Sequence, residues 1–597
     1  MPFGMSSKPP ILGAVPRRAL LWCGLYGTLS VVFCAPLFEQ PVALGINDWD
    51  QHLFYYGSVL KSVVEYGQAP FWNPWYCGGN VLWQNPQVGL LSPVYPLSAV
   101  MPLQLAMKVN IVLHYWVGFL GMHLLLTRVV GLTFAPAVIY LATLVTAAGA
   151  PAIHLAVGHS VFLPGFYLPA QLYFLFRAFK SGAVKDALIA AAILALMVFN
   201  GGAHILPMVF ASLAVFTVLA AAMTRRWQPL GIALVFVAAG LAYSAPKLLP
   251  VSLFVTGERF WDTRNPTEHP DRMTLEMVTR TYLNPDQDLR TKLDQQRHGW
   301  HEYGNYIGPA SAFLLMAGLL VAVWGRRAPD AWFGRALALT AGFLFVLSLG
   351  EFSAWAPASL LKHVPLFSSF RIPSRYTIPF LLFGAIGLGW VVRGFSLETR
   401  SRAVQAVVGV LCIGLAAHLI SVNRGQFTGV FTVAPFDTTF RWMAGPSEGM
   451  TTDAQSSAYT PTSPMLRSLV TNRFFYYCYE SLQLVRVTNP EQPTLFSEGG
   501  ATITETAFTP NRIDFAVFGS AAPSRLYLNY NWGPGWTSAA GEIDHTPERI
   551  ASVVLRPGQT GRYSFAFVPP GLWAGSAILL AALGLSVVVW RRSWLLR

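Results

Sequence analysis

The stretch "ALLWCGLYGTLSVVFCA", residues 19–35, decides the fold class, because it contains no charged residue and is long enough to cross the hydrocarbon core of a bilayer as a helix. No convincing small-x-small cleavage site follows it, so we expect a retained first helix rather than a signal peptide. Similar runs recur along the chain. The twelve predicted spans are residues 19–36, 107–127, 132–150, 161–178, 184–200, 204–223, 229–254, 307–325, 334–350, 377–394, 403–422 and 571–590.

Composition and charge agree with a multi-pass membrane protein. Hydrophobic residues make up 53% of the chain and charged residues only 12%, a balance far from that of soluble proteins. The net charge of +13 comes mainly from short basic clusters, such as Arg225 with Arg226, that fall on one side of the predicted membrane. By the positive-inside rule both termini are cytoplasmic, although residues 255–306 carry several Arg residues on the outer side. This distribution argues against nucleic acid as a partner.

Three predicted external regions stand out by length. They are residues 37–106, 255–306 and 423–570. The last is long enough to fold alone. It contains the alternating runs "RIDFAVFG" (512–519), "RLYLNY" (525–530) and "RYSFAFV" (562–568), which predict an antiparallel β-sandwich. We therefore expect a mainly α polytopic module over residues 1–422, a β-rich domain over 423–570, and a final helix with a short tail over 571–597.

The five cysteines are too few for a disulfide scaffold. Cys23, Cys34 and Cys412 lie inside apolar runs, where a thiol packs as a small hydrophobic group. Cys77 and Cys478 lie in predicted external segments, and the sequence leaves open whether they form a disulfide or remain free thiols.

The chemistry-bearing residues have to be sought outside the membrane, because phosphate-loop, dinucleotide, HExxH, CxxC and GxSxG signatures are all absent. Two acids, Asp48 and Asp50, flank one Trp in "INDWDQHLFYYG" (46–57). In most membrane proteins such acids only mark the water boundary. Here they begin a loop of about seventy residues, and loops of that length are usually functional or disordered. The loop continues with "PFWNPWYCGGN" (70–80) and "QNPQVGLLSPVYPL" (84–97), which favour a rigid, amphipathic groove at the membrane surface.

An Asp soon after the first helix, ten or more further spans and a C-terminal external domain resemble the GT-C superfamily of membrane glycosyltransferases. Within it, "DWDQH", "PFWNP", "NPQVGLLSPVYPL", "FRIPSRY" (370–376) and the late "GPGW" look like the bacterial YfhO-like membrane proteins. The resemblance covers most of the chain. Many superfamily members end in their soluble domain, whereas this chain has a final predicted span after its β domain. That arrangement is also YfhO-like.

The resemblance implies hexosyl or pentosyl transfer from a polyprenyl-phosphate donor to an envelope acceptor, a glycan, lipid or protein, on the outer face of the bacterial cytoplasmic membrane. Such a donor already carries its phosphate leaving group, so the protein must mainly deprotonate the acceptor hydroxyl and neutralise the phosphate. We expect Asp48 to be the general base, because it stands nearer the first helix and looks like the superfamily's acid. Asp50 is its expected partner, because residues i and i+2 of an extended backbone point the same way, and the spacing alone leaves their division of labour open. The resemblance also allows Asp48 and Asp50 to share a divalent metal, as in some superfamily members, but two carboxylates are an incomplete ligand set, so the sequence leaves a metal cofactor open.

Several further residues are candidates for substrate binding. Arg371 and Arg375 lie four apart before a predicted span, where they could bind phosphate together or simply anchor to lipid headgroups. The other candidates are polar residues at predicted outer helix ends and amides beside Pro, namely His159, His204, Glu302, Tyr303, Asn73, Asn85 and Gln87. Each has a structural alternative: a lone His at a helix end is more often structural, and an amide beside Pro often forms a turn.

The alternative function is a transporter, or a lipid- or glycan-handling assembly protein, without chemistry. Transporters usually place ionisable residues at mid-membrane on broken helices related by internal repeats. This chain has nearly charge-free mid-span regions and no evident repeat. The enzyme hypothesis predicts that Asp48 faces a cleft shared with Arg371 or Arg375.

Overall fold

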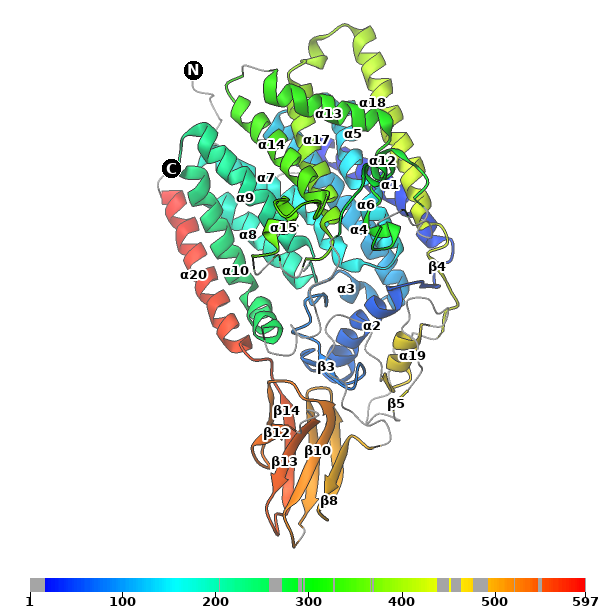
Figure 1. Ribbon diagram of the computed structural model, residues 1–597, viewed down its shortest axis with the longest axis vertical. Coiled ribbons are helices and arrows are strands. Elements are labelled where there is room, and N and C mark those ends of the chain that lie inside the picture. The colour runs from blue at the N-terminus through cyan, green and yellow to red at the C-terminus, as the bar shows by residue number, and fades with distance from the viewer. Residues whose placement is uncertain are drawn as a thin grey trace.

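The structure is a computed structural model that describes residues 17–202, 204–256, 271–287, 293, 296–325, 328–364, 367, 370–436, 450–451, 463–475, 492–519, 521–545 and 550–595. A bundle of helices forms most of the molecule, and a β-sandwich stands at one end of it, which we call the sandwich end (Figure 1). A small layer of short helices and strands lies between the two (Figure 1).

All twelve predicted spans are helical. Their helices are α1 (Arg17–Cys34), α4 (Leu103–Leu124), α5 (Ala135–Thr146), α7 (Leu168–Ser181), α8 (Val184–Phe199), α9 (Ile205–Thr224), α10 (Gln228–Val255), α13 (Pro309–Trp324), α14 (Ala331–Ser348), α17 (Thr377–Arg393), α18 (Arg402–Asn423) and α20 (Leu572–Leu595). Within the described part of the chain, nine helical segments are long and apolar enough to cross a membrane, while α7, α8 and α13 have 14, 16 and 16 residues.

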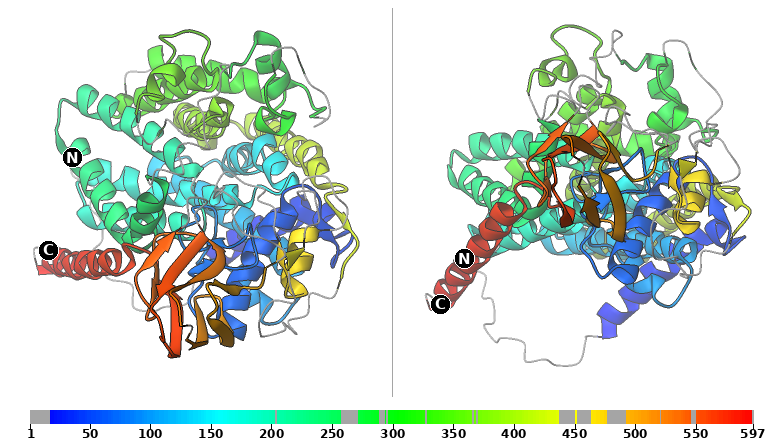
Figure 2. Two further views of the ribbon diagram at one scale, coloured as in Figure 1. Left: turned by 60° about the horizontal axis from the view of Figure 1, so that its bottom comes forward. Right: turned by 90° about the horizontal axis from the view of Figure 1, so that it is seen from below.

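The bundle also contains shorter elements that fill its ends. They are η1 (Ala35–Phe38), η2 (Lys61–Glu65), η3 (Leu125–Val130), α6 (Gly149–Ala156), η4 (Ser160–Tyr167), α12 (Leu275–Leu283), η5 (Trp300–Glu302), α15 (Pro357–Leu361), η6 (Pro373–Tyr376), η7 (Leu397–Thr399) and η8 (Arg424–Phe427). Helix α20 leaves the sandwich and runs along α10 at the edge of the bundle (Figures 1 and 2). Only 11% of the most apolar stretch of this helix is buried within the protein, so most of the helix surface is suited to contact with lipid.

The sandwich consists of two four-stranded antiparallel sheets, in the orders β12-β13-β10-β7 and β11-β14-β9-β8. The strands are β7 (Leu495–Glu498), β8 (Thr502–Thr509), β9 (Arg512–Phe518), β10 (Ser524–Asn531), β11 (Trp536–Ser538), β12 (Ile543–His545), β13 (Ile550–Leu555) and β14 (Gly561–Phe567). In β9 the alternate residues Ile513, Phe515 and Val517 are buried, as period-two alternation requires. The predicted fold class, a mainly helical membrane protein with a β domain before its last helix, is confirmed.

The layer between bundle and sandwich begins with helix α2 (Trp49–Leu60) and continues with residues 66–93, which we call the first loop. The first loop is fixed to the sandwich by Trp72, whose ring lies 4.8 Å from that of Phe567 and 5.2 Å from that of Trp536. The backbone N–H of Asn531 also donates to the carbonyl of Gly78 at 2.8 Å. The short elements of this layer are β1 (Leu44–Gly45), β2 (Trp72–Asn73), β3 (Asn80–Val81), α3 (Val94–Ser98), β4 (Phe431–Val433), β5 (Met450–Thr451), α19 (Pro464–Val470) and β6 (Phe474–Phe475).

Chain segments far apart in sequence meet in this layer. Strand β1 pairs with β4, and α2 packs against α19. Cys77 is disulfide-bonded, whereas Cys23, Cys34 and Cys412 are free thiols. Cys478 lies outside the described residues.

Candidate active site

Asp48 stands at the residue before α2, the position where an Asp often caps a helix with its side chain. It makes no such cap bond here, and its Oδ2 lies 3.1 Å from Nε2 of His159. Its backbone N–H donates to the carbonyl of Val157 at 3.0 Å, which fixes the turn carrying His159 against the start of α2. The Asp48 side chain keeps 21% of its surface exposed, whereas all of α2 is buried. Asp48 is therefore a carboxylate that reaches solvent and is oriented by a histidine.

A glycine allows this close approach. Gly158 has a φ of +98°, and a Cβ atom on it would lie 2.4 Å from the backbone nitrogen of Trp49. Only glycine combines that backbone conformation with that contact. The "VGHS" turn thus depends on Gly158 to bring His159 to Asp48.

Two further histidines surround His159. Nδ1 of His154, on α6, lies 3.0 Å from Nδ1 of His159. The His154 ring stacks on Phe162 of η4, with ring centroids 3.9 Å apart and planes 7° apart. The ring of His301, on η5, meets that of His159 edge-on at 5.3 Å.

A buried ion pair closes the other side of this group. The guanidinium of Arg375, on η6, donates from Nε and Nη2 to the two carboxylate oxygens of Glu302 at 2.7 and 2.6 Å. The Arg375 and Glu302 side chains are 9% and 5% exposed. Nε2 of His301 lies 3.6 Å from Oε1 of Glu302, so the ion pair is continuous with the histidines. We call the whole group the polar cluster: Asp48, His154, His159, His301, Glu302 and Arg375.

The charges in the polar cluster are set by burial and by the ion pair. Burial alone would raise the pKa of Glu302, but the charge and hydrogen bonds of Arg375 hold it well below the usual value. Burial lowers the pKa of His301 to about 4, although Glu302 and Asp48 oppose the shift. At neutral pH Glu302 is therefore ionised and His301 is neutral. Ligand atoms of His159, His301 and Glu302 lie within 4.8 Å of one another, which is a spacing that a metal ion could bridge.

Asp50 does not share this site, and the expectation that it faces the same cleft as Asp48 is wrong. The segment is helical rather than extended, so a spacing of two residues turns the two carboxylates to different sides of α2. The carboxylate of Asp50 is buried and accepts the backbone N–H groups of Met465 and Leu466, each at 2.9 Å. Asp50 thus binds the first turn of α19.

The amides of the first loop also bond locally. Oδ1 of Asn73 accepts the backbone N–H of Trp75 at 3.1 Å, and Oδ1 of Asn85 accepts that of Gln87 at 3.0 Å. Both are turns in which the side chain bonds to the backbone two residues on. Lys247, on α10, donates from Nζ to the carbonyl of Asn85 at 2.8 Å. These bonds place Asn73, Asn85 and the backbone of Gln87 in turns of the first loop.

Tyr303 belongs to a neighbouring group. Its hydroxyl donates to Oδ1 of Asp271 at 2.7 Å, and Oδ2 of Asp271 lies 3.8 Å from Nε2 of His298. Burial raises the pKa of Asp271 to about 6 and lowers that of His298 to about 4. Tyr303 therefore bonds to Asp271, whereas Glu302, adjacent to it in sequence, bonds to Arg375.

The two arginines of "FRIPSRY" have different environments. Arg375 is committed to Glu302, and its guanidinium also lies 5.3 Å from the centre of the Phe162 ring. Arg371 is exposed, and its positive charge contributes to the lowered pKa of His298, after burial and nearer charges. His204 approaches the cluster through Phe162, whose ring centroid is 6.1 Å from its own.

Sequence reasoning missed His154 and His301 as members of the polar cluster. His154 lies inside an apolar helix, where a single His is usually structural, and His301 was overlooked beside Glu302. A signal was present in "HLAVGHS", in which two His residues flank a turn with a glycine.

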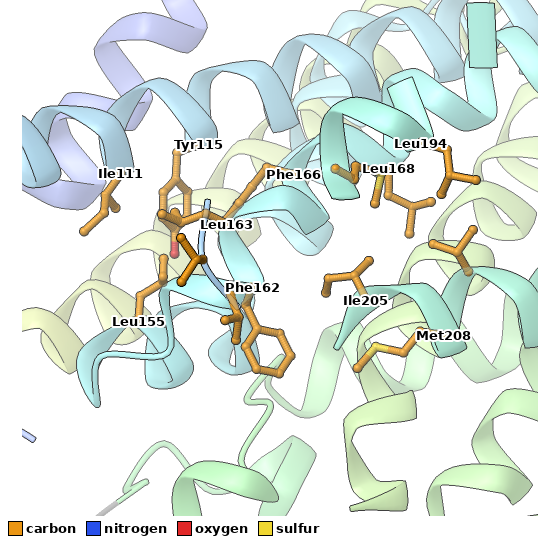
Figure 3. Close-up of a cluster of buried hydrophobic side chains, with 14 of the residues drawn as sticks. Ile111, Tyr115, Leu155, Phe162, Leu163, Phe166, Leu168, Leu194, Ile205 and Met208 are labelled. Carbon is orange, nitrogen blue, oxygen red and sulfur yellow. The ribbon is translucent and has the colours of Figure 1, made fainter. Parts of the chain in front are cut away.

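An apolar pocket adjoins the polar cluster. Phe162 forms part of its wall, and Ile205 and Met208 of α9 face Phe162 across it (Figure 3). Other parts of the wall come from α4, α5, α6, η4, α7 and α17 and include Gly118, Thr146, Phe166, Leu168 and Leu382. Phe162 is thus shared: one face stacks on His154, and the residue also lines the apolar pocket.

No protein-family model matches the sequence, and no curated protein sequence matches it. Among solved structures, the chain is similar to the arabinofuranosyltransferase AftD from Mycobacteria, with 14% identity and a TM-score of 0.45 over 93% of this chain and 40% of that one. A mutant of the same enzyme gives 13% identity and a TM-score of 0.43 over 93% of this chain and 42% of that one. The chain therefore spans about two fifths of the length of these structures.

Proposed function

We propose that the chain is a membrane glycosyltransferase of the GT-C type, YfhO-like in its architecture, that uses a polyprenyl-phosphate-linked sugar as donor. The observation that carries this proposal is that Phe162 lines the apolar pocket and also stacks on His154 of the polar cluster, so that the two adjoin. A ligand that contacts both the polar cluster and the apolar pocket needs a charged head and a long apolar tail. Polyprenyl-phosphate sugars have that chemistry, and a ligand of either kind alone would use only half of the site.

Asp48 is the proposed general base. Its carboxylate accepts the proton of the acceptor hydroxyl while the hydroxyl oxygen bonds to the anomeric carbon of the sugar. The bond from that carbon to the phosphate oxygen breaks, and polyprenyl phosphate leaves with the electron pair. A base must reach the hydroxyl within hydrogen-bonding distance, and Asp48 combines partial exposure with an orienting contact from His159.

Arg371 is the proposed phosphate-binding cation, and Arg375 is a positioning residue. The charge of Arg375 is already balanced by Glu302, and two donors of its guanidinium are already used in hydrogen bonds to that carboxylate. Arg371 is exposed, acts electrostatically on His298 of the neighbouring group, and makes no ion pair within the described residues. His204 and Tyr303 would lie at the margin of the donor site, outside the polar cluster. Asp50, Asn73 and Asn85 are better explained as structural, because the side chain of each accepts backbone N–H groups. Gln87 contributes its backbone N–H to the turn that Asn85 closes.

The orientation follows from the proposed reaction. We infer that the sandwich end faces outward from the bacterial cytoplasmic membrane and that both termini are cytoplasmic, with domain limits at 1–422, 423–570 and 571–597. The basic clusters between spans support this orientation. The acceptor is an envelope glycan, lipid or protein.

The test is transfer by the purified full chain in proteoliposomes supplied with radiolabelled polyprenyl-phosphate hexoses and pentoses and with envelope extract as acceptor. We expect the wild-type protein to release polyprenyl phosphate from one donor and the Asp48→Asn variant to be slower by about 10²- to 10⁴-fold, the usual contribution of a general base. Glu276→Gln, at an exposed position of α12, is the matched control and should keep full activity. Movement of intact donor across the bilayer without release of polyprenyl phosphate would favour the transporter alternative and contradict the proposal.

A further inference from the structure

Three side chains of the polar cluster form a set of metal-ligand atoms. His159, His301 and Glu302 each offer one atom, and all three atoms lie within 4.8 Å of one another. Two imidazoles and one carboxylate are the donor set of many three-residue metal sites that keep a further position open. The set comes from two segments, the turn before η4 and η5, that are far apart in sequence.

The surroundings hold these side chains in place. The carboxylate of Glu302 is fixed by both hydrogen bonds from Arg375, and the hydroxyl of Ser374 donates to the Glu302 carbonyl at 2.7 Å. His159 contacts Asp48 through Nε2 at 3.1 Å and His154 through Nδ1 at 3.0 Å, so the nitrogen that binds the metal gives up one of these contacts and the other contact orients the ring. Ligands in metal sites are usually supported in this way, with carboxylates and histidines bonded to outer partners.

The charges of the polar cluster favour the binding of a cation. The group contains two carboxylates, Asp48 and Glu302, and one guanidinium, that of Arg375. Each carboxylate oxygen has two lone pairs, so Oε1 of Glu302 can accept from Arg375 and still bind a metal on its other side. A divalent ion would add positive charge to a group in which one guanidinium stands with two carboxylates.

We propose that His159, His301 and Glu302 bind one divalent transition-metal ion, of the Zn²⁺ or Co²⁺ class, beside Asp48. The two nitrogen donors decide the class of metal, because Mg²⁺ and Ca²⁺ prefer ligand sets made of oxygen alone. The site differs from a metal shared between Asp48 and Asp50, since Asp50 is committed to α19. Metal binding is separate from glycosyl transfer, so either proposal can fail without the other.

The test measures bound metal rather than activity. The full chain is purified in detergent, stripped with a chelator, titrated with Zn²⁺, Co²⁺, Mg²⁺ or Ca²⁺, desalted and analysed for metal per chain by mass spectrometry. We expect one Zn²⁺ or Co²⁺ per wild-type chain above any background, with visible absorption of the Co²⁺ form, and no retained Mg²⁺ or Ca²⁺. His301→Asn should lower the affinity at least tenfold and remove the Co²⁺ absorption.

Two further variants make the result decisive. Glu302→Gln tests the carboxylate, and His301→Asn remains informative if Glu302→Gln fails to fold, which size-exclusion and thermal unfolding reveal. His418→Ala is the control, because His418 is exposed on α18 and its Nε2 bonds to the Tyr306 hydroxyl. The proposal is overturned if the wild type retains no Zn²⁺ or Co²⁺, if it retains Mg²⁺ or Ca²⁺ instead, or if folded His301→Asn binds like the wild type.

Discussion

The polar cluster and the first loop are both rich in polar side chains, but they use them differently. In the first loop, Asn73 and Asn85 accept backbone N–H groups two residues away. In the polar cluster, Asp48 contacts His159 and Glu302 contacts Arg375, so side chains from distant segments meet one another. Local bonds of the first kind shape a chain, whereas groups of charged side chains held together in a partly exposed site are typical of function.

The largest expected effect on stability is at the buried ion pair of the polar cluster. Arg375→Met leaves the Glu302 carboxylate buried without its partner, so we expect a loss of about 3–5 kcal/mol in unfolding free energy. The pair Arg393 and Asp330 has similar bidentate geometry, but its side chains are 28% and 30% exposed. Arg393→Met should therefore cost only about 1 kcal/mol. Thermal unfolding in detergent compares the two, and equal losses would contradict the assigned role of burial.

The same pair gives a pH dependence with a definite sign. Glu302 has a pKa below its ordinary value of 4.5, so its contribution is fully present above that pH and is lost as the pH falls. As the pH falls below 4.5, the unfolding free energy of the wild type should decrease, and that of Arg375→Met should decrease less.

The second-largest effect is expected in the first loop. Nζ of Lys247 donates to the carbonyls of Trp83, Asn85 and Val88 at 2.6, 2.8 and 3.3 Å. Lys247→Met leaves these buried acceptors without their donor, at a cost of about 1–3 kcal/mol. Unfolding should shift while the transfer rate per folded molecule stays unchanged. A rate that falls at constant stability would place Lys247 in the chemistry.

The smallest effect concerns Asp50, which binds the first turn of α19. Burial raises its pKa from 3.8 to about 6, despite the opposing bonds from Leu466 and Met465. A raised pKa means that the stabilising contribution is present below pH 3.8 and is lost as the pH rises through about 6. Protection of the Met465 and Leu466 amides from hydrogen exchange, corrected for intrinsic rates, should fall over that range, and Asp50→Asn should flatten the profile. Loss of this side-chain cap should cost about 0.5–2 kcal/mol.

Much of the fold could be predicted from the sequence, because its signals are local. Apolar run length located every span, and alternation located β9, β10 and β14. The pairing of Asp48 with Asp50 could not be settled in this way. The answer depends on α2 beginning at Trp49. Two residues that are two positions apart point to the same side of a strand but to different sides of a helix.

The membership of the polar cluster also lay beyond local patterns. His159 and Glu302 are predicted as separate helix-end residues, and the packing of α6 against η5 brings the turn that carries His159 to Glu302. Likewise, Arg371 and Arg375 look equivalent in sequence, but Pro373 begins a 3₁₀ turn that buries the second and leaves the first exposed. Contacts over such separations are set by the whole bundle. The catalytic and binding roles of these residues stay predictions.

The difference between the two regions can be measured directly by comparing Asp48→Asn with Asn85→Ala in the same reconstituted transfer assay, normalised to folded protein. We predict that Asp48→Asn keeps wild-type unfolding but loses transfer by about 10²-fold or more, whereas Asn85→Ala lowers stability and keeps the rate per folded molecule. Full transfer by folded Asp48→Asn, or an equal loss of rate in both variants, would contradict the assignment of the chemistry to the polar cluster.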